Sequence, residues 1–475
     1  MSLVLLIPDG VGARNFLIGP FLRLACENWT THVFHNIPED HLTAYANGLS
    51  EKTHWREFDA YRETPVSATL RYSLNYAHMH WGDTQAMRYI RSLPVNGSWR
   101  RRAVQYASRL TGRVAATRAG IKTLDHLLCQ TAGRQPEVER YREILQQIKP
   151  QIIFCSHQRP PVILPLVLAA RSLGISTSTF IFSWDNLSSK GRIAAPFDHY
   201  LVWSEHMRDE LLRFYPDVSA ERIHVVGTPQ FDPYADQSLL WPREEFFARI
   251  GADASRPLIC YSGGDEMTAP EDHLHIRALM ELIREGRVKN NPQVILRPAP
   301  VDDGSRYEAV RRDFPELIYA RPAWIHTTPG EWSRVIPSRD DAQFLANLTR
   351  HADVNVNLAS TMTLDFAIHD RPVVNIAFDI ADPPPLGKPL WDFYYRFEHY
   401  QPVVKIGAAR FARSRDELAE HVNAYLDDPS LDREARRQLV NLQISVPIGQ
   451  SSRKIIEVLK QVSSASREPK DSLLK

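Results

Sequence analysis

Cysteine and long hydrophobic runs are both scarce in this chain. Its 475 residues include only four cysteines, and no two of them form a C-x-x-C pair. A disulfide framework needs a denser pattern, so we expect four reduced packing residues. No apolar run approaches the roughly 18 to 20 residues of a membrane span, and the opening MSLVLLIPDG lacks the basic start of a secretory signal. The sequence therefore predicts a cytoplasmic protein.

Excess charge and several common motifs are missing as well. The chain has 57 basic and 56 acidic residues, so its charges nearly balance and binding of nucleic acid through bulk charge is not expected. The dinucleotide fingerprint G-x-G-x-x-G fails, since Gly10 and Gly12 are followed by Asn15 at the third glycine position. No G-x-S-x-G hydrolase elbow occurs. The H-x-H pairs at 78–80 and 273–275 have no third partner in the sequence, so we predict no metal.

Short apolar runs alternate with helical patterns along most of the chain. The predicted strands are SLVLLI, QIIFC, TSTFIF, HYLVW and RIHVV in the first half and PLICYS, QVILR, DVNVNL and PVVNIAF in the second. Continuous apolar strands between helices are typical of parallel sheets covered on both faces. The sequence therefore predicts an α/β protein.

A turn-rich stretch, GTPQFDPYADQ, separates two such series. We predict an N-terminal lobe at 1–240, a C-terminal lobe at 241–450, and a last helix with its tail at 451–475. Open α/β sheets bind ligands at the carboxyl ends of their strands. Two lobes that face each other would put the site in the cleft between them.

A helical segment at about 40–145 is inserted in the first lobe and is strongly basic in its middle. Between Asp83 and Asp125 there are nine basic residues and no acidic one. On a helix, one face would carry Ala103, Ala107, Leu110 and Val114, and another would carry Arg102, Arg109 and Arg113. Such a helix either binds anionic lipid or a phosphorylated substrate, or is a solvated face over a hydrophobic seam. The first alternative predicts peripheral contact of 88–122 with the inner face of an anionic membrane.

Polar side chains follow three predicted strands of the first lobe, at Asp9, at His157 and in SWDNLSSK. A buried polar group without a partner costs about 1 to 3 kcal/mol, so a strand that ends in such a cluster indicates a polar ligand. Helix capping or turn formation is the alternative explanation for each residue. We predict Asp185 as the catalytic base, with His157 as the second choice, and Lys190, Asn186 and Asp9 as contacts to an acceptor or a phosphate.

Three strand ends of the second lobe carry groups suited to a phosphate. In NLASTMTLDF a strand ends and a helix begins at a serine and a threonine, with an aspartate one turn further on. Free N–H groups at a helix start and an arginine fork both bind phosphate, and a glycine lets the backbone approach a ligand. The predicted donor-binding residues are Gly263, Gly264, Arg297, Ser360, Thr361 and Asp365.

These pieces resemble a known family in their order along the chain. SWDNLSSKG, VVGTPQFD, the RPAP strand end, the ST-initiated helix, and RFEHY followed by SRDELAEHVNAYL are similar to the GT-B nucleotide-sugar glycosyltransferases. The resemblance is greatest to bacterial surface-polysaccharide enzymes near the glycerophosphotransferases of teichoic acid synthesis, and it covers about 150–465. The family's frequent pair of glutamates eight positions apart is here Asn357 and Asp365, and its His-Pro is here Ala299 and Pro300.

The resemblance implies the GT-B fold, in which two Rossmann-like lobes with parallel sheets face a central cleft. It also implies donor nucleotide in the second lobe, acceptor in the first, and a last helix that crosses back to the first lobe. In that arrangement Asp365 would hold the ribose, and Ser360 and Thr361 the diphosphate.

The predicted function is transfer of a sugar from a nucleotide-sugar donor to a glycan or lipid-linked acceptor in bacterial surface polysaccharide synthesis. No cofactor or metal is expected, because fixed donors at Arg297, Ser360 and Thr361 would meet the charge on the leaving diphosphate. Two alternatives share the fold. A sugar-nucleotide 2-epimerase would convert its substrate with no acceptor present, and a catalytically silent assembly partner would bind nucleotide without turnover.

Overall fold

A computed structural model describes residues 1–38, 41–42, 45, 52–326 and 335–465. The chain divides into two compact units: unit 1 consists of 1–230 with 445–475, and unit 2 of 231–444. The change of unit therefore comes earlier than the predicted position 240. Within the predicted insertion, residues 40, 43–44 and 46–51 lie outside the described residues, as does the predicted tail from 466 onward.

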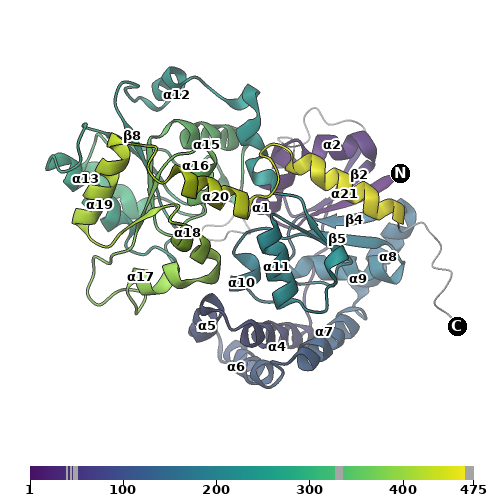
Figure 1. The fold of residues 1–475 in the computed structure, drawn as a ribbon. Coiled ribbons are helices and arrows are strands. Elements are labelled where there is room, and N and C mark those ends of the chain that lie inside the picture. The colour runs from purple at the N-terminus through teal and green to yellow at the C-terminus, as the bar shows by residue number, and fades with distance from the viewer. Residues whose placement is uncertain (39–40, 43–44, 46–51, 327–334, 466–475) are drawn as a thin grey trace. The chain divides into compact units, whose positions relative to one another are not determined.

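Unit 1 is built on a sheet of seven strands (Figure 1). The strands are β1 (Ser2–Ile7), β2 (Thr30–His35), β3 (Thr53–Glu57), β4 (Ile152–Cys155), β5 (Ser176–Phe180), β6 (His199–Val202) and β7 (Ile223–Val225). Their order across the sheet is β3-β2-β1-β4-β5-β6-β7, and all neighbours are parallel. Because these neighbours are parallel, the carboxyl ends of β1, β4 and β5 lie side by side along the edge of the sheet where its strands end.

Strands β2 and β3 were not predicted. β3 is the edge strand, and none of its five residues is fully buried. β2 reads TTHVFH, with threonines and histidines at four of its six positions. Neither strand has a continuous apolar run, which is the pattern from which the other strands were predicted. Of the two, only β3 falls in the insertion predicted at about 40–145.

The helices of unit 1 cover the sheet and form the insertion. They are α1 (Gly10–Ala13), α2 (Phe21–Asn28), α4 (Pro65–Gly82), α5 (Gln85–Ser92), α6 (Trp99–Val114), α7 (Arg118–Ala132), α8 (Pro136–Ile148), α9 (Leu164–Ser172), α10 (Asn186–Ser189), α11 (Glu205–Phe214) and α21 (Ser451–Ala465). α6 and α7 both pack on α4, and α21, although last in the chain, packs on α2, β4 and β5 (Figure 1). Among the helices of the described ranges, none is long and apolar enough to cross a membrane.

The stretch that follows β1 has the apolar periodicity of one helix but forms two helical pieces. The segment NFLIGPFLRLACE forms a π-helical turn, Arg14–Ile18, and then α2. Gly19 and Pro20 lie between the two pieces, and Pro20 has no N–H to continue the helical hydrogen bonds. The local backbone chemistry therefore overrides the apolar periodicity here.

Unit 2 contains a second parallel sheet, of six strands. The strands of unit 2 are β8 (Leu258–Ser262), β9 (Gln293–Arg297), β10 (Ile318–Tyr319), β13 (Val354–Asn357), β14 (Val373–Ile376) and β15 (Arg410–Ala412), with an antiparallel pair β11 (Ile325–His326) and β12 (Val335–Ile336) beside them in the sequence. The order of the large sheet is β10-β9-β8-β13-β14-β15. Its helices are α12 (Arg243–Ile250), α13 (Asp272–Arg284), α14 (Glu308–Asp313), α15 (Arg339–His351), α16 (Met362–Ile368), α17 (Leu390–Phe393), α18 (Gln401–Ile406), α19 (Arg415–Asp427) and α20 (Arg433–Gln443).

The cores of both units lie between these sheets and their helices. Every residue of β4, β5, β8, β13 and β14 is buried, as the continuous strand patterns predict. β5 is buried although it reads STSTF, because the hydroxyls of Ser178 and Thr179 donate to backbone carbonyls of β4. The prediction of two parallel-sheet α/β domains is confirmed.

Candidate functional site

Three polar side chains follow neighbouring strands of unit 1. β1 is followed by Asp9, β4 by His157, and β5 by the loop that carries Asp185. Because β1 pairs with β4 and β4 pairs with β5, these loops leave the same edge of the sheet. The structure brings Asp9 and His157 into direct contact, while Asp185 belongs to a second group of hydrogen bonds.

Asp9 and His157 form a buried pair. Asp9 Oδ2 lies 2.6 Å from His157 Nδ1, and Asp9 Oδ1 accepts a hydrogen bond of 3.0 Å from the Gly12 N–H in α1. Burial acts to raise the pKa of Asp9, but the charge and hydrogen bond of His157, helped by backbone N–H groups, hold that pKa below its ordinary value. Asp9 is therefore an ionised carboxylate. In the Nδ1–H tautomer, His157 donates to this carboxylate, and the lone pair of the ring lies on Nε2.

The second ring nitrogen of His157, Nε2, has a different environment. It is buried, and in the part of the chain that the structure describes it has no hydrogen-bond partner. The ring packs against Phe182, with the two ring centroids 4.7 Å apart, and this contact fixes its plane. A buried group without a partner is costly, so an orphaned lone pair at a strand end indicates a position for a substrate proton. Imidazole oriented by carboxylate is the arrangement of a general base.

Asp185, Asn186 and Lys190 form the second group, on the loop after β5. Asp185 Oδ1 accepts a hydrogen bond of 3.0 Å from Asn186 Nδ2, and Oδ2 accepts one of 2.8 Å from Ser189 Oγ. Oδ2 also lies 3.6 Å from Lys190 Nζ. Both carboxylate oxygens are thus engaged within the loop itself. Asp185 is for this reason a weaker candidate for the base than the imidazole.

Two cations accompany these groups. Arg159 follows the strand end of β4. Desolvation of its guanidinium lowers its pKa, and the carboxylates of Asp185 and Asp9 oppose that shift. Lys190 is partly exposed. An anionic ligand at this edge would meet both charges. Lys190 is among the predicted site residues, whereas Arg159 is not.

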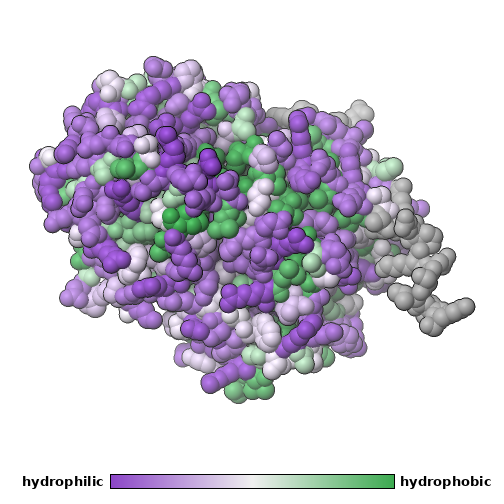
Figure 2. All heavy atoms as spheres, viewed as in Figure 1, coloured by the Kyte–Doolittle hydropathy of each residue, from purple (hydrophilic) through white to green (hydrophobic). Residues whose placement is uncertain are grey.

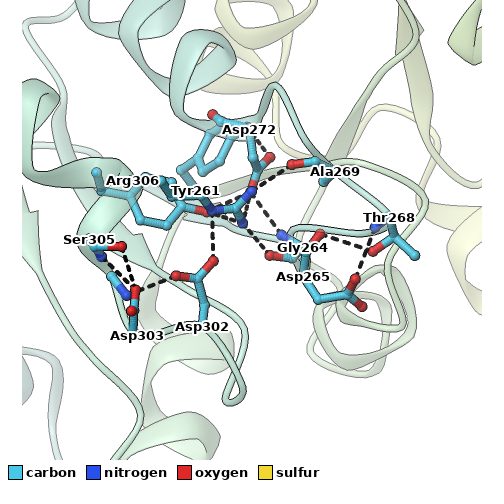
Figure 3. A network of polar contacts seen from close by, with 12 residues as sticks. Tyr261, Gly264, Asp265, Thr268, Ala269, Asp272, Asp302, Asp303, Ser305 and Arg306 are labelled. Atoms are coloured by element: carbon cyan, nitrogen blue, oxygen red, sulfur yellow. Dashed lines mark hydrogen bonds and ion pairs between the residues drawn. The ribbon is translucent and has the colours of Figure 1, made fainter. Parts of the chain in front are cut away.

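Hydrogen bonds to other residues of unit 2 hold the glycine turn after β8. Gly264 N donates to Asp272 Oδ2 at 2.8 Å, and Gly264 O accepts from Arg306 Nη2 at 2.5 Å, as Figure 3 shows. Asp272 also accepts a hydrogen bond of 2.6 Å from Tyr261 Oη. Burial raises the pKa of Asp272, and the phenol hydrogen bonds and the charge of Arg306 oppose that rise. The turn at Gly263 and Gly264 is thereby held rigid.

The substitution Gly263→Ala should lower the free energy of unfolding of unit 2 by about 1 to 3 kcal/mol. A Cβ at this position would lie 2.6 Å from Tyr307 Oη and 2.9 Å from Asp272 Oδ2, so the network would have to move. Urea unfolding followed by circular dichroism measures the loss. Gly19→Ala is the matched control, since nothing lies within 4 Å of its Cβ. Equal stability of the two variants would contradict this packing role.

Arg297, a predicted phosphate ligand, is buried at the end of β9 in an ion pair. Its Nη2 lies 2.9 and 2.8 Å from the two carboxylate oxygens of Asp341. Asp341 accepts a further hydrogen bond of 2.7 Å from the indole N–H of Trp324. Nη1 of Arg297 is buried and has no hydrogen-bond partner among the described residues. Nη2 therefore serves the fold, and the phosphate role of Arg297 stays a prediction that concerns Nη1.

The loop from β13 to α16 carries Ser360 and Thr361. Before them, Ala359 has a φ of +45°, in the left-handed region that residues with side chains rarely adopt. Thr361 is the N-cap residue of α16, yet its side chain makes no capping hydrogen bond. Ser360 Oγ accepts a bond of 3.3 Å from Met362 N. Strained backbone of this kind is concentrated at ligand sites.

Three fully buried asparagines support this loop, and none is among the predicted site residues. Asn375 Oδ1 accepts a hydrogen bond from Ala359 N at 3.2 Å, and Asn357 Oδ1 accepts one from Ser360 N at 3.1 Å. Asn357 Nδ2 donates to Asn355 Oδ1 at 2.6 Å. Asn375 Nδ2 is buried and has no hydrogen-bond partner among the described residues, so this network is satisfied on its acceptor side and leaves one donor unused. The sequence does contain a signal for these residues, because asparagine is unusual inside apolar strands such as VNVN and VVNI.

Asp365, the predicted ribose ligand, lies one turn into α16 and is buried. Its Oδ1 accepts a hydrogen bond from Tyr234 Oη. A ribose hydroxyl would have to share this carboxylate with the phenol. The ribose role of Asp365 stays a prediction.

The H-x-H pairs at 78–80 and 273–275 contact the protein. His80 Nδ1 pairs with Arg91, and His275 Nε2 lies 2.9 Å from the carbonyl oxygen of Phe378. Within the described ranges, no group of three histidine, cysteine, aspartate or glutamate side chains is placed to hold a metal ion.

Comparisons with known proteins bear on the fold. No protein-family model matches the chain, and no curated protein sequence matches it. Solved structures do match. UDP-GlcNAc 2-epimerase from Neisseria meningitidis, bound to UDP-GlcNAc, superposes with a TM-score of 0.53 at 10% identity over 97% of this chain and 100% of that one. Other UDP-N-acetylglucosamine 2-epimerases, one of them from Rickettsia bellii, also match.

Two transferases are similar to the same extent. A glycosyltransferase from Rickettsia africae gives a TM-score of 0.52 at 11% identity, with 99% of each chain covered. The wall teichoic acid polymerase TagF gives 0.51 at 10% identity, over 98% of this chain and 89% of that one. Identity this low establishes architecture alone. With its two parallel-sheet α/β units, the chain has the GT-B fold.

Proposed function

We propose that this protein is an enzyme that acts on a nucleotide-activated sugar, with His157 as its general base. The observation that carries the proposal is the buried pair of Asp9 and His157, whose Nε2 lies at a strand end without a partner among the described residues. The fold supports the substrate class, because similar structures include an epimerase bound to UDP-GlcNAc and a glycosyltransferase.

We assign the nucleotide to the strand ends of unit 2. Three features lie at strand ends of one parallel sheet. They are the strained backbone of Ala359, the side chain of Thr361 that makes no capping hydrogen bond, and Nη1 of Arg297, which has no hydrogen-bond partner among the described residues. Backbone N–H groups, a hydroxyl and a guanidinium together suit a diphosphate. Asp9, predicted as a ligand contact, is instead assigned to orient and charge-stabilise the imidazole.

Two reactions suit a base of this kind. In epimerisation beside the anomeric centre, His157 Nε2 takes the proton at C2, the electron pair of that C–H bond forms a C1=C2 double bond, and the nucleotide diphosphate leaves with the electron pair of the C1–O bond. The diphosphate oxygen then bonds to C1 again, and the electron pair of the double bond takes a proton on the opposite face of C2. In glycosyl transfer, Nε2 takes the proton of an acceptor hydroxyl, the acceptor oxygen bonds to the anomeric carbon, and the nucleotide diphosphate leaves with the electron pair of the broken bond. Since 2-epimerases are the more frequent among the similar structures, we place epimerisation first. Glycosyl transfer, the function predicted from the sequence, becomes the second candidate.

Incubation with UDP-GlcNAc alone in D2O distinguishes the two reactions. Epimerisation needs no acceptor, and because the base exchanges its proton with solvent, we expect deuterium at C2 of substrate and product in the NMR spectrum. A glycosyltransferase would leave UDP-GlcNAc unlabelled and consume it only when a glycan or lipid-linked acceptor is added. Incorporation of deuterium therefore supports the first candidate and excludes the second as the sole activity.

Thermal stabilisation by UDP, GDP, CDP, CMP and ADP tests the substrate class separately. A ligand at 100 times its dissociation constant adds about 2.7 kcal/mol to the stability of the unit that binds it. Stabilisation without turnover of any sugar nucleotide would indicate a catalytically silent partner. Absence of stabilisation by all five nucleotides would contradict the proposed function.

A further inference from the structure

Helix α6 is attached to unit 1 by its small residues, not by its apolar ones. Ser108 and Gly112 are its buried positions. Ser108 Oγ donates to the Thr69 carbonyl of α4, and a Cβ on Gly112 would lie 2.8 Å from Ser73 O and 2.9 Å from Ala77 N. The two helices therefore cross in close backbone contact.

The apolar face of α6 lies on the opposite side and is exposed. With 3.6 residues per turn, Leu110 is half a turn away from Ser108 and Gly112. Trp99, Tyr106, Leu110 and Val114 share this face and are 74, 53, 67 and 78% exposed. Ala103 and Ala107 between them are exposed as well. The predicted hydrophobic face is thus correct in its residues, but it does not pack on the protein.

Figure 2 shows the consequence on the surface. Hydrophobic side chains gather at the lower edge of the molecule, where Figure 1 draws α6. In a protein that stays in water, an amphipathic helix turns its apolar stripe to the core. A contiguous exposed stripe of this length indicates a surface that another phase or partner covers.

Arginines flank the exposed stripe. Arg102 and Arg113 lie along one side and Arg100 along the other, and no acidic residue occurs between 84 and 124. Other arginines of the insertion have carboxylate partners: Arg88 and Arg91 share the carboxylate of Asp83, and Arg118 pairs with Asp217. By contrast, within the described residues Arg100, Arg101, Arg102 and Arg113 form no ion pair. The unbalanced charge of the insertion is therefore concentrated around the apolar stripe.

We propose that α6 is a membrane-binding helix that lies in the headgroup region of an anionic phospholipid surface. Its apolar stripe would be buried among the acyl chains at the headgroup boundary, and the flanking guanidinium groups would meet lipid phosphates. Trp99 and Tyr106 are the side-chain types that favour this interface. The charge complementarity selects lipid over a second copy of the chain, because two copies would bring the same unpaired arginines together. This surface includes none of the strand-end residues assigned to the base in unit 1 or to the nucleotide in unit 2. The proposal therefore does not depend on the proposed reaction.

Co-sedimentation with vesicles tests this proposal. The full chain should bind vesicles of phosphatidylcholine with phosphatidylglycerol at low salt and be released as the salt approaches 1 M, where the Debye length falls to about 3 Å. Leu110→Asp should weaken binding by about tenfold or more, since it removes a buried apolar side chain and adds repulsion. Arg113→Gln should weaken it by about fivefold. Both positions are exposed, so the melting temperature should not change.

Met267→Asp is the matched control for the apolar change, because Met267 is an exposed large hydrophobic residue in unit 2. It should bind vesicles as the unchanged protein does. Hydrogen exchange gives a second readout: anionic vesicles should slow exchange in 99–114. Equal binding to pure phosphatidylcholine, or full binding by Leu110→Asp, would overturn the proposal. A dimer that Leu110→Asp dissolves, without vesicle binding, would overturn it in favour of a second copy of the chain.

Discussion

We expect His157→Gln to lower the turnover of the sugar nucleotide by about a hundred- to ten-thousand-fold, the usual contribution of a general base. Glutamine retains a donor that can reach the Asp9 carboxylate, but it has no lone pair of suitable basicity at the position of Nε2. The variant should still be stabilised by the nucleotide, because nucleotide binding is assigned to unit 2. The two measurements are the rate constant kcat for UDP-GlcNAc and the shift in melting temperature on adding UDP.

His126→Gln is the control for this change, since His126 is an exposed residue of α7 whose ring contacts Gln130. It should leave kcat unchanged. Asp9→Asn should lower kcat as well, because the neutral amide no longer stabilises the imidazolium formed when Nε2 takes a proton. If kcat of His157→Gln were within fivefold of that of the unchanged enzyme, His157 would not be the general base. Asp185→Asn would then be the variant to measure.

Asp341→Ala should lower the free energy of unfolding of unit 2 by about 3 to 5 kcal/mol. The substitution leaves the Arg297 guanidinium buried without its counter-charge, and it leaves the Trp324 indole N–H without its acceptor. Removing one partner of a buried ion pair costs more than the pair itself contributes, because the remaining charge is desolvated and unpaired. Urea unfolding followed by circular dichroism measures the change.

Asp340→Ala is a closely matched control for this experiment. Asp340 is the preceding residue in the same helix, but its side chain is exposed. Its removal should change the stability by less than about 0.5 kcal/mol. If Asp341→Ala were equally mild, Arg297 would not be held by this ion pair in solution, and its whole guanidinium would be available to a phosphate.

Much of the fold could be predicted because the central strands are continuous apolar runs. SLVLLI, QIIFC and QVILR read as buried strands, and each forms one. Pro160 and Pro161 precede α9 and Gly174 follows it, with a φ of +71° at the glycine, which is the usual placement of these residue types around a helix. Strands without an apolar run, such as β3, were missed, because an edge strand is specified by pairing with its neighbour and not by its own burial.

The candidate site was predictable to the level of strand ends only. Which polar residues follow a strand can be read from the sequence, and Asp9, His157 and Asp185 all do. The sequence does not show which of these side chains are in contact, because that depends on the order of the strands in the folded sheet. The preference for Asp185 as base rested on the density of polar residues around it, and in the structure those same residues occupy its carboxylate.

The amino-acid sequence by itself determined the class of fold, the polar strand ends, and the composition of the α6 face, since each depends on local periodicity and side-chain chemistry. Tertiary structure alone decided three further points. It placed Asp9 next to His157 across 148 residues of sequence, it gave Arg297 a buried counter-ion in Asp341, and it turned the apolar face of α6 outward. The physical reason is the same in each case: hydrogen bonding, ion pairing and burial depend on which neighbours the sheet order and helix packing supply, and no local pattern encodes those neighbours.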